Sequence, residues 1–69
     1  GLTWREQISF ILTQEFTIKR IQYLDVLQEE AEGHGDDAAS LMFASQILMT
    51  EALSTMLSEL VSHLGGWQD

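Results

Sequence analysis

Residues 29–37 read EEAEGHGDD and form the one interior stretch of this sequence that favours a turn. The other glycines lie at position 1 and at positions 65 and 66, and proline is absent. Two long segments therefore run on either side of the turn without a strong helix breaker. The pattern predicts an all-α chain with one helical-hairpin domain over residues 1–69, in which antiparallel helices at about 4–32 and 37–64 flank a turn at 33–36.

Both predicted helices carry start and stop signals. Thr3 and Glu6 have the spacing of a capping box, in which each side chain bonds the backbone N–H of the other residue. Either Asp36 or Asp37 can cap the second helix, because a carboxylate suits the positive end of the helix dipole. Gly65 and Gly66 predict a Schellman-type end, with Trp67 folding back on the helix.

Residues 8–18 also resemble a strand, because apolar and polar residues alternate there and many are β-branched or aromatic. We favour a helix because a strand at this place has no nearby turn that brings a second strand beside it. An unpaired strand would leave its backbone groups without hydrogen bonds.

The predicted helices carry more apolar surface than one hairpin buries. In the second helix, the densest apolar line has a heptad-like spacing and consists of Met42, Gln46, Met49, Leu53, Met56, Leu60 and His63, widened by Leu57, Val61 and Leu64. On its opposite face, Glu51, Ser54, Thr55, Ser58 and Ser62 can face water. The first helix has apolar residues along two lines about half a turn apart, and one partner covers only one line.

This surplus predicts a homodimer that forms a four-helix bundle, because a two-fold contact buries the same patch twice. The alternatives are that another protein covers the surplus, or that the rest of a longer parent chain does. The expected partner or dimer interface comprises Trp4, Ile8, Ile11, Phe16, Ile18, Met49, Leu53, Met56 and Leu60.

Charge and composition narrow the expected partners. Three Lys and Arg residues against eleven Asp and Glu residues give a net charge of −8, which repels phosphate backbones and anionic membrane surfaces. No apolar run reaches the roughly 20 residues of a membrane span. We therefore expect a soluble cytoplasmic chain with no direct nucleic-acid contact, no membrane contact and no small-molecule substrate.

The acidic residues around the turn are the main candidates for chemistry. We expect them either to form a solvated loop or to dock a basic partner, and they are Glu29, Glu30, Glu32, Asp36 and Asp37. A calcium loop beginning at Glu30 would need a glutamate at its twelfth position, where Leu41 stands. His34 and His63 lie at opposite ends of the second helix and cannot share a zinc ion within one hairpin.

Catalysis has little support in the sequence. There is no cysteine, and no serine has a histidine at a spacing that places a base beside it. A two-helix chain also offers no concave pocket of its own. We expect no enzyme activity, no cofactor and no metal.

Two functions fit these observations. The first is a non-catalytic protein-interaction module that self-associates and docks onto another protein, as an adaptor, an assembly domain or a small inhibitor. The second is an acidic regulator that occupies a basic surface of its target, such as a nucleic-acid-binding face. Added salt weakens the second kind of contact more than the first.

Overall fold

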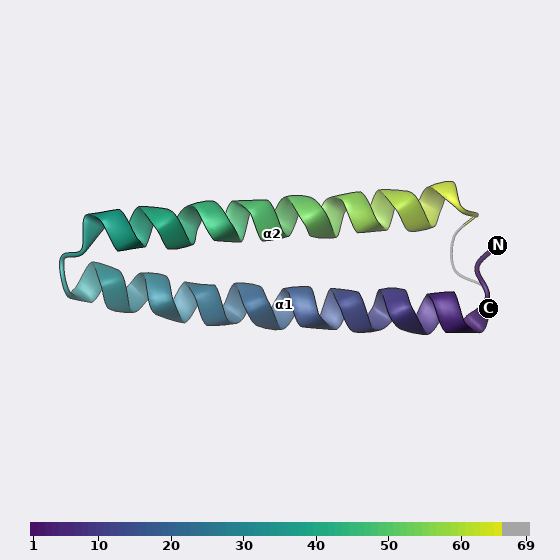
Figure 1. The fold of residues 1–69 in the computed structure, drawn as a ribbon, viewed down its shortest axis with the longest axis horizontal. Coiled ribbons are helices and arrows are strands. Elements are labelled where there is room, and N and C mark those ends of the chain that lie inside the picture. The colour runs from purple at the N-terminus through teal and green to yellow at the C-terminus, as the bar shows by residue number, and fades with distance from the viewer. Residues whose placement is uncertain (66–69) are drawn as a thin grey trace.

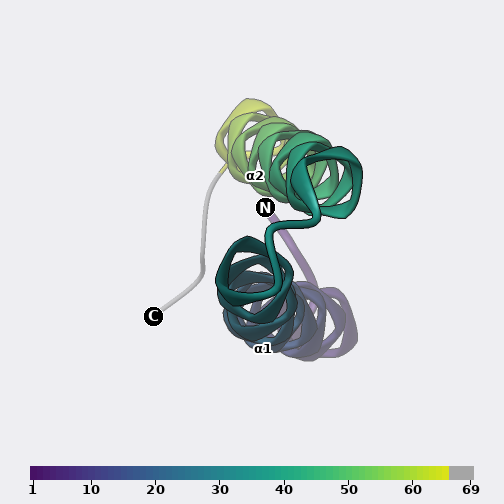
Figure 2. The same ribbon diagram turned by 90° about the vertical axis from the view of Figure 1, so that its left-hand side faces the viewer.

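The computed structural model describes residues 1–65, and it confirms the all-helical hairpin. Helix α1 runs over Trp4–Gly33 and helix α2 over Asp37–His63, against the expected 4–32 and 37–64. The helices lie side by side and antiparallel, in a molecule 48 Å long (Figure 1). The segment that resembled a strand lies inside α1. Seen from the turn, the two helices form a single layer (Figure 2).

Local hydrogen bonds fix where each helix begins. The predicted capping box is confirmed: the Glu6 N–H donates to the Thr3 hydroxyl at 3.3 Å, and the Thr3 N–H donates to Glu6 Oε1 at 3.2 Å. Asp36 caps α2 by accepting from the Ala39 N–H at 3.1 Å. Before α1, Leu2 is buried, and its carbonyl accepts from the Gln7 side chain.

The turn between the helices depends on one glycine with a left-handed backbone. Gly35 has φ +72°, which a side chain would strain. Beside it, the Asp36 N–H donates to the Ala31 carbonyl at 2.9 Å and closes the end of α1. At the end of α2, Gly65 has φ +101° and its N–H donates to the Ser62 carbonyl. Gly66 and Trp67, which were also assigned to this end, lie outside the described residues.

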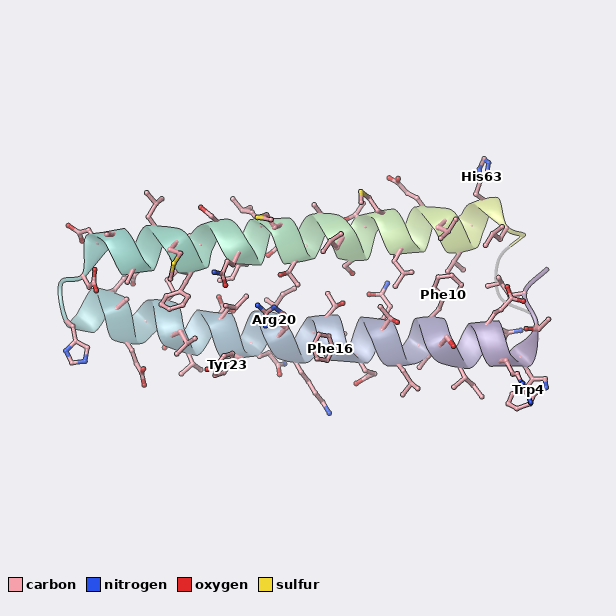
Figure 3. The ribbon with its side chains drawn as sticks, in the orientation of Figure 1. Trp4, Phe10, Phe16, Arg20, Tyr23 and His63 are labelled. Carbon is pink, nitrogen blue, oxygen red and sulfur yellow. The ribbon has the colours of Figure 1, made fainter. Side chains whose placement is uncertain are left out.

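The interhelical seam follows a heptad-like pattern in both helices, with residues spaced alternately three and four apart. In α1 the buried or half-buried seam positions are Gln7, Phe10, Gln14, Thr17, Ile21, Leu24, Gln28 and Ala31. In α2 they are Ser40, Phe43, Ile47, Thr50, Ser54, Leu57 and Val61. Phe10 points from α1 toward α2 (Figure 3).

The face of α2 that packs against α1 lies about 100° of helix rotation away from the heptad-like line of methionines and leucines. Met42, Met49, Leu53, Met56 and Leu60 are all exposed, whereas Ile47 and Val61 are buried. His63 points away from α1 (Figure 3). The expectation that Ser54 faces water is wrong, because its side chain is half-buried and bonds Gln14 of α1. Instead, small and polar side chains such as Ser40 and Ser54 face α1, while the methionines face outward.

Polar seam residues are tolerated because their hydrogen bonds are made inside the hairpin. The Thr17 hydroxyl donates to the Thr13 carbonyl at 2.8 Å, and the Thr50 hydroxyl donates to the Gln46 carbonyl at 2.7 Å. Among the described residues, no buried side-chain nitrogen or oxygen lacks a partner. The seam therefore avoids the free-energy cost of an unsatisfied buried polar group.

Within residues 1–65, neither α1 nor α2 is long and apolar enough to cross a bilayer.

Candidate functional site: a groove between the helices

An open groove runs along one face of the hairpin, between the middle of α1 and the second half of α2. Its volume is about 570 Å³. It is lined by Thr13, Phe16, Thr17, Arg20, Thr50, Leu53, Met56, Leu57 and Leu60, and these residues define the interhelical groove. The expectation that the chain has no concave site of its own is therefore wrong, because seven-residue spacing along both helices leaves a continuous furrow between two rows of side chains.

The walls of the interhelical groove are apolar and exposed. Phe16 is 67% exposed, Leu53 59% and Met56 56%, so large apolar surfaces stand open to water on both sides. The threonine hydroxyls are already occupied, since Thr13 donates to the Ser9 carbonyl as Thr17 and Thr50 donate within their own helices. The groove is thus suited to apolar side chains from outside.

Among the described residues, Arg20 is the one charged side chain that lines the groove. Its side chain extends from α1 toward the gap between the helices (Figure 3). Within residues 1–65 it makes no ion pair, and no carboxylate lines the groove beside it. The groove therefore combines apolar walls with one positive charge on a molecule that is otherwise strongly acidic.

The structure divides the predicted interface residues into two groups. Four of the nine line the interhelical groove: Phe16, Leu53, Met56 and Leu60. Four others, Trp4, Ile8, Ile11 and Ile18, lie on the side of α1 opposite the groove residues Thr13 and Arg20, as the 100° helical spacing requires. Met49 is exposed on α2 but does not line the groove.

The second group forms an apolar stripe of its own on α1. Its first member, Trp4, points away from α2, with the Arg5 guanidinium 5.7 Å from the centre of its ring (Figure 3). Its members are between 46% and 67% exposed. A partner that packs on the interhelical groove cannot also cover this stripe, because the stripe lies on the other side of α1. The hairpin therefore has two separate exposed apolar faces.

The acidic residues at the turn have local structural roles. Asp36 caps α2, Asp37 lies in its first turn, and Glu32 accepts from the Ser40 hydroxyl at 3.3 Å. Glu29 and Glu30 are exposed near the end of α1. Docking of a basic partner on these five residues stays a prediction. Across residues 1–65, no three His, Cys, Asp or Glu side chains are grouped so that they could hold a metal ion.

Sequence reasoning missed the polar contact that joins the helices at the level of the groove. The Ser54 hydroxyl donates to Gln14 Oε1 at 2.7 Å, and Gln14 Nε2 donates to the Ser58 hydroxyl at 3.1 Å. The signal was present in the spacing, because Gln7, Gln14 and Gln28 continue the heptad line of Ile21. The position of Arg20 in the groove lining was missed for the same reason, because the groove forms only when this polar seam faces inward.

Comparison with known proteins identifies a family. The family model described as "Putative exonuclease, RdgC" matches residues 1–67. A recombination-associated protein RdgC of Neisseria meningitidis is 81% identical over 69 residues, which are 100% of this chain and 23% of that protein. RdgC proteins of Laribacter hongkongensis and a Janthinobacterium species are 46% and 43% identical, each over 66 residues, 96% of this chain and 22% of those proteins.

The chain thus spans about a quarter of the length of the curated relatives that it matches. No solved structure matches it.

These similarities overturn three of our expectations. A generic protein-binding adaptor and an acidic regulator of another protein are both wrong as functions, because the relatives are named for recombination, which is a DNA process. The expectation that nucleic acid is not a partner is wrong for the same reason. The net charge of −8 misled us because it describes about a quarter of the length of such a protein, and charge on one segment does not set the charge of the whole.

Proposed function

Since the chain belongs to the RdgC family, we propose that it is the helical hairpin of a longer protein that acts on DNA in recombination, and that it joins two copies of that protein. In this proposal two hairpins stack with their interhelical grooves together and form a four-helix bundle. The observation that carries it is the groove itself, which presents exposed apolar side chains from both helices on one face.

The distribution of charge supports this pairing. Like charges disfavour the association of two chains that each carry −8, but the groove lining contains no carboxylate. A two-fold axis across the long axis of the hairpin places the two acidic turns at opposite ends of the bundle, where they are farthest apart. Two copies also bring two DNA-contacting surfaces to one duplex, which raises the effective concentration of the second surface.

The test uses the full-length parent protein. Leu53 and Met56 are both changed to Glu, and the control is Thr55→Glu, which lies on the opposite side of α2 and does not line the groove. Light scattering at micromolar concentration should give twice the chain mass for the wild type and the control, and the single mass for the double variant. DNA affinity, measured by fluorescence anisotropy, should fall together with dimerisation. A monomeric wild type, or a double variant that stays dimeric, would refute the proposal.

We further infer that the hairpin holds no catalytic centre, although the family description names an exonuclease. This inference is supported by the lining of the groove, which offers threonine hydroxyls engaged by backbone carbonyls and no histidine, cysteine or carboxylate. Changing Asp36 and Asp37 to Asn should leave any nuclease activity of the parent protein unchanged in an assay with Mg²⁺ and end-labelled DNA. Loss of activity in a variant that is still folded and dimeric would contradict this inference. A role on DNA also supports the expectation of a cytoplasmic location.

A further inference from the structure

We propose that reciprocal ion pairs fix the register of the two hairpins: Arg20 of each copy meets Glu6 of the other, about a two-fold axis that passes beside Thr13. This inference rests on the proposed function, because it specifies how the second copy lies on the interhelical groove.

Three residues on α1 are spaced so that a two-fold axis can exchange an acidic and a basic side chain. Glu6, Thr13 and Arg20 are seven residues apart in turn, which is close to two helical turns, so they lie along one line of the helix with a drift of about 20° per step. At about 1.5 Å per residue, Glu6 and Arg20 are about 21 Å apart, with Thr13 midway. A half-turn about an axis through Thr13 therefore exchanges the positions of the acid and the base.

This line faces the groove. Thr13 and Arg20 both line the groove, and Glu6 continues their row toward the start of α1. A second α1 that crosses antiparallel at Thr13 thus brings opposite charges together at both ends of the contact.

Helix α2 has the same symmetry at the same level. Leu53 and Leu60 are seven residues apart and lie on either side of Met56 and Leu57, and all four line the groove. The hydrogen bonds of Gln14 to Ser54 and Ser58 place this stretch of α2 beside Thr13. The axis that exchanges Glu6 and Arg20 therefore also exchanges the levels of Leu53 and Leu60. One two-fold axis therefore relates both the charged pair on α1 and the leucine pair on α2.

Both charged groups are available for this contact. Arg20 makes no ion pair within residues 1–65. Glu6 is exposed, and the hydrogen bonds from Thr3 use its Oε1 atom. A parallel arrangement of the hairpins would instead place Arg20 against Arg20 and one acidic turn against the other. The antiparallel two-fold pairing is the arrangement that the charges favour.

Charge reversal in the full-length parent protein tests the pairing. Arg20→Glu and Glu6→Arg each place like charges opposite one another twice per dimer, and we expect each to raise the dimer dissociation constant about tenfold. The double variant restores opposite charges and should return to within about threefold of the wild type. Lys19→Glu is the control, since it changes the net charge as much as Arg20→Glu does but Lys19 does not line the groove.

Cross-linking gives a second measurement that does not depend on the capping box of Glu6. The hairpin has no cysteine, so Thr13→Cys introduces a single thiol in a parent protein whose other cysteines are replaced. A short bis-maleimide should join two Thr13→Cys copies, whereas Thr55→Cys copies should stay unlinked.

The outcomes separate the two proposals. If the wild type is dimeric but double reversal gives no rescue and Thr13→Cys does not cross-link, the register is wrong and groove pairing survives. If the wild-type parent protein is monomeric, the register and the pairing both fail.

Discussion

Gln14 and Ser54 join the two helices through a hydrogen bond of 2.7 Å, in which the serine hydroxyl donates to the amide oxygen. The amide nitrogen of Gln14 donates in turn to Ser58. One glutamine thus holds two consecutive turns of α2, at a level where Thr17 and Thr50 also contribute hydroxyls to the seam.

Replacing Gln14 with alanine should weaken the hairpin. The substitution removes two hydrogen bonds, each worth about 0.5–1.5 kcal/mol, so the expected loss of stability is about 1–3 kcal/mol. Amide hydrogen exchange of α1 and α2 in the parent protein measures it. Gln22→Ala is the matched control, because Gln22 is exposed on the same helix and should change stability by less than about 0.5 kcal/mol. Equal exchange in both variants would show that the contact contributes nothing.

The two glycines of the turn should respond in opposite directions to the same substitution. Gly35→Ala forces a side chain into a left-handed backbone and should cost about 1 kcal/mol, although no atom lies within 4 Å of the added Cβ. Gly33→Ala meets open space at a helical position and should stabilise by about 0.5–1 kcal/mol. Thermal unfolding of the two variants gives the comparison, and a similar shift in both would contradict the role of the backbone at Gly35.

Leu24 is the side chain in α1 whose truncation should cost most, because it is 2% exposed in the seam. Leu24→Ala should destabilise the hairpin by about 2–5 kcal/mol through lost burial and the cavity that remains. Leu24→Met keeps the volume and should cost less than about 1.5 kcal/mol. Urea unfolding measures both variants, and a mild effect of the alanine would mean that the seam closes around the gap.

The capping box should make the start of α1 sensitive to acid. Hydrogen bonds from the Thr3 side chain and backbone lower the pKa of Glu6 below its usual value of 4.5. A carboxylate with a lowered folded pKa contributes stability above the unfolded value, and the contribution is lost as the pH falls through the folded value. Carbon-detected NMR titration of Glu6 should give a midpoint below 4.5. In Thr3→Ala the midpoint should move upward, and an unchanged midpoint would show that Thr3 is not the cause.

The helices and their ends could be predicted from the sequence because their signals are local. A threonine three residues before a glutamate marks the start of α1. A glycine between two acidic stretches marks the turn. Neither signal depends on distant residues. The structure confirms both.

The direction in which α2 faces could not be predicted in the same way. The line of Met49 and Met56 is more apolar than the line of Thr50 and Ser54, and composition alone favours burying the methionines. Periodicity alone does not say which of the two lines packs inside the hairpin and which faces outward. The groove and the place of Arg20 in its lining were missed with it, because the groove exists only when the threonine and serine line faces inward.

The hydroxyl-rich seam also has a consequence for the order in which the parent protein assembles. Contacts between α1 and α2 bury few large apolar groups, so we expect surfaces that cover its outer faces to add to the stability of the hairpin. Until these faces are covered, its exposed methionines and isoleucines can bind chaperones or other incompletely folded chains. We therefore expect assembly of the parent protein to depend on when these apolar faces are covered.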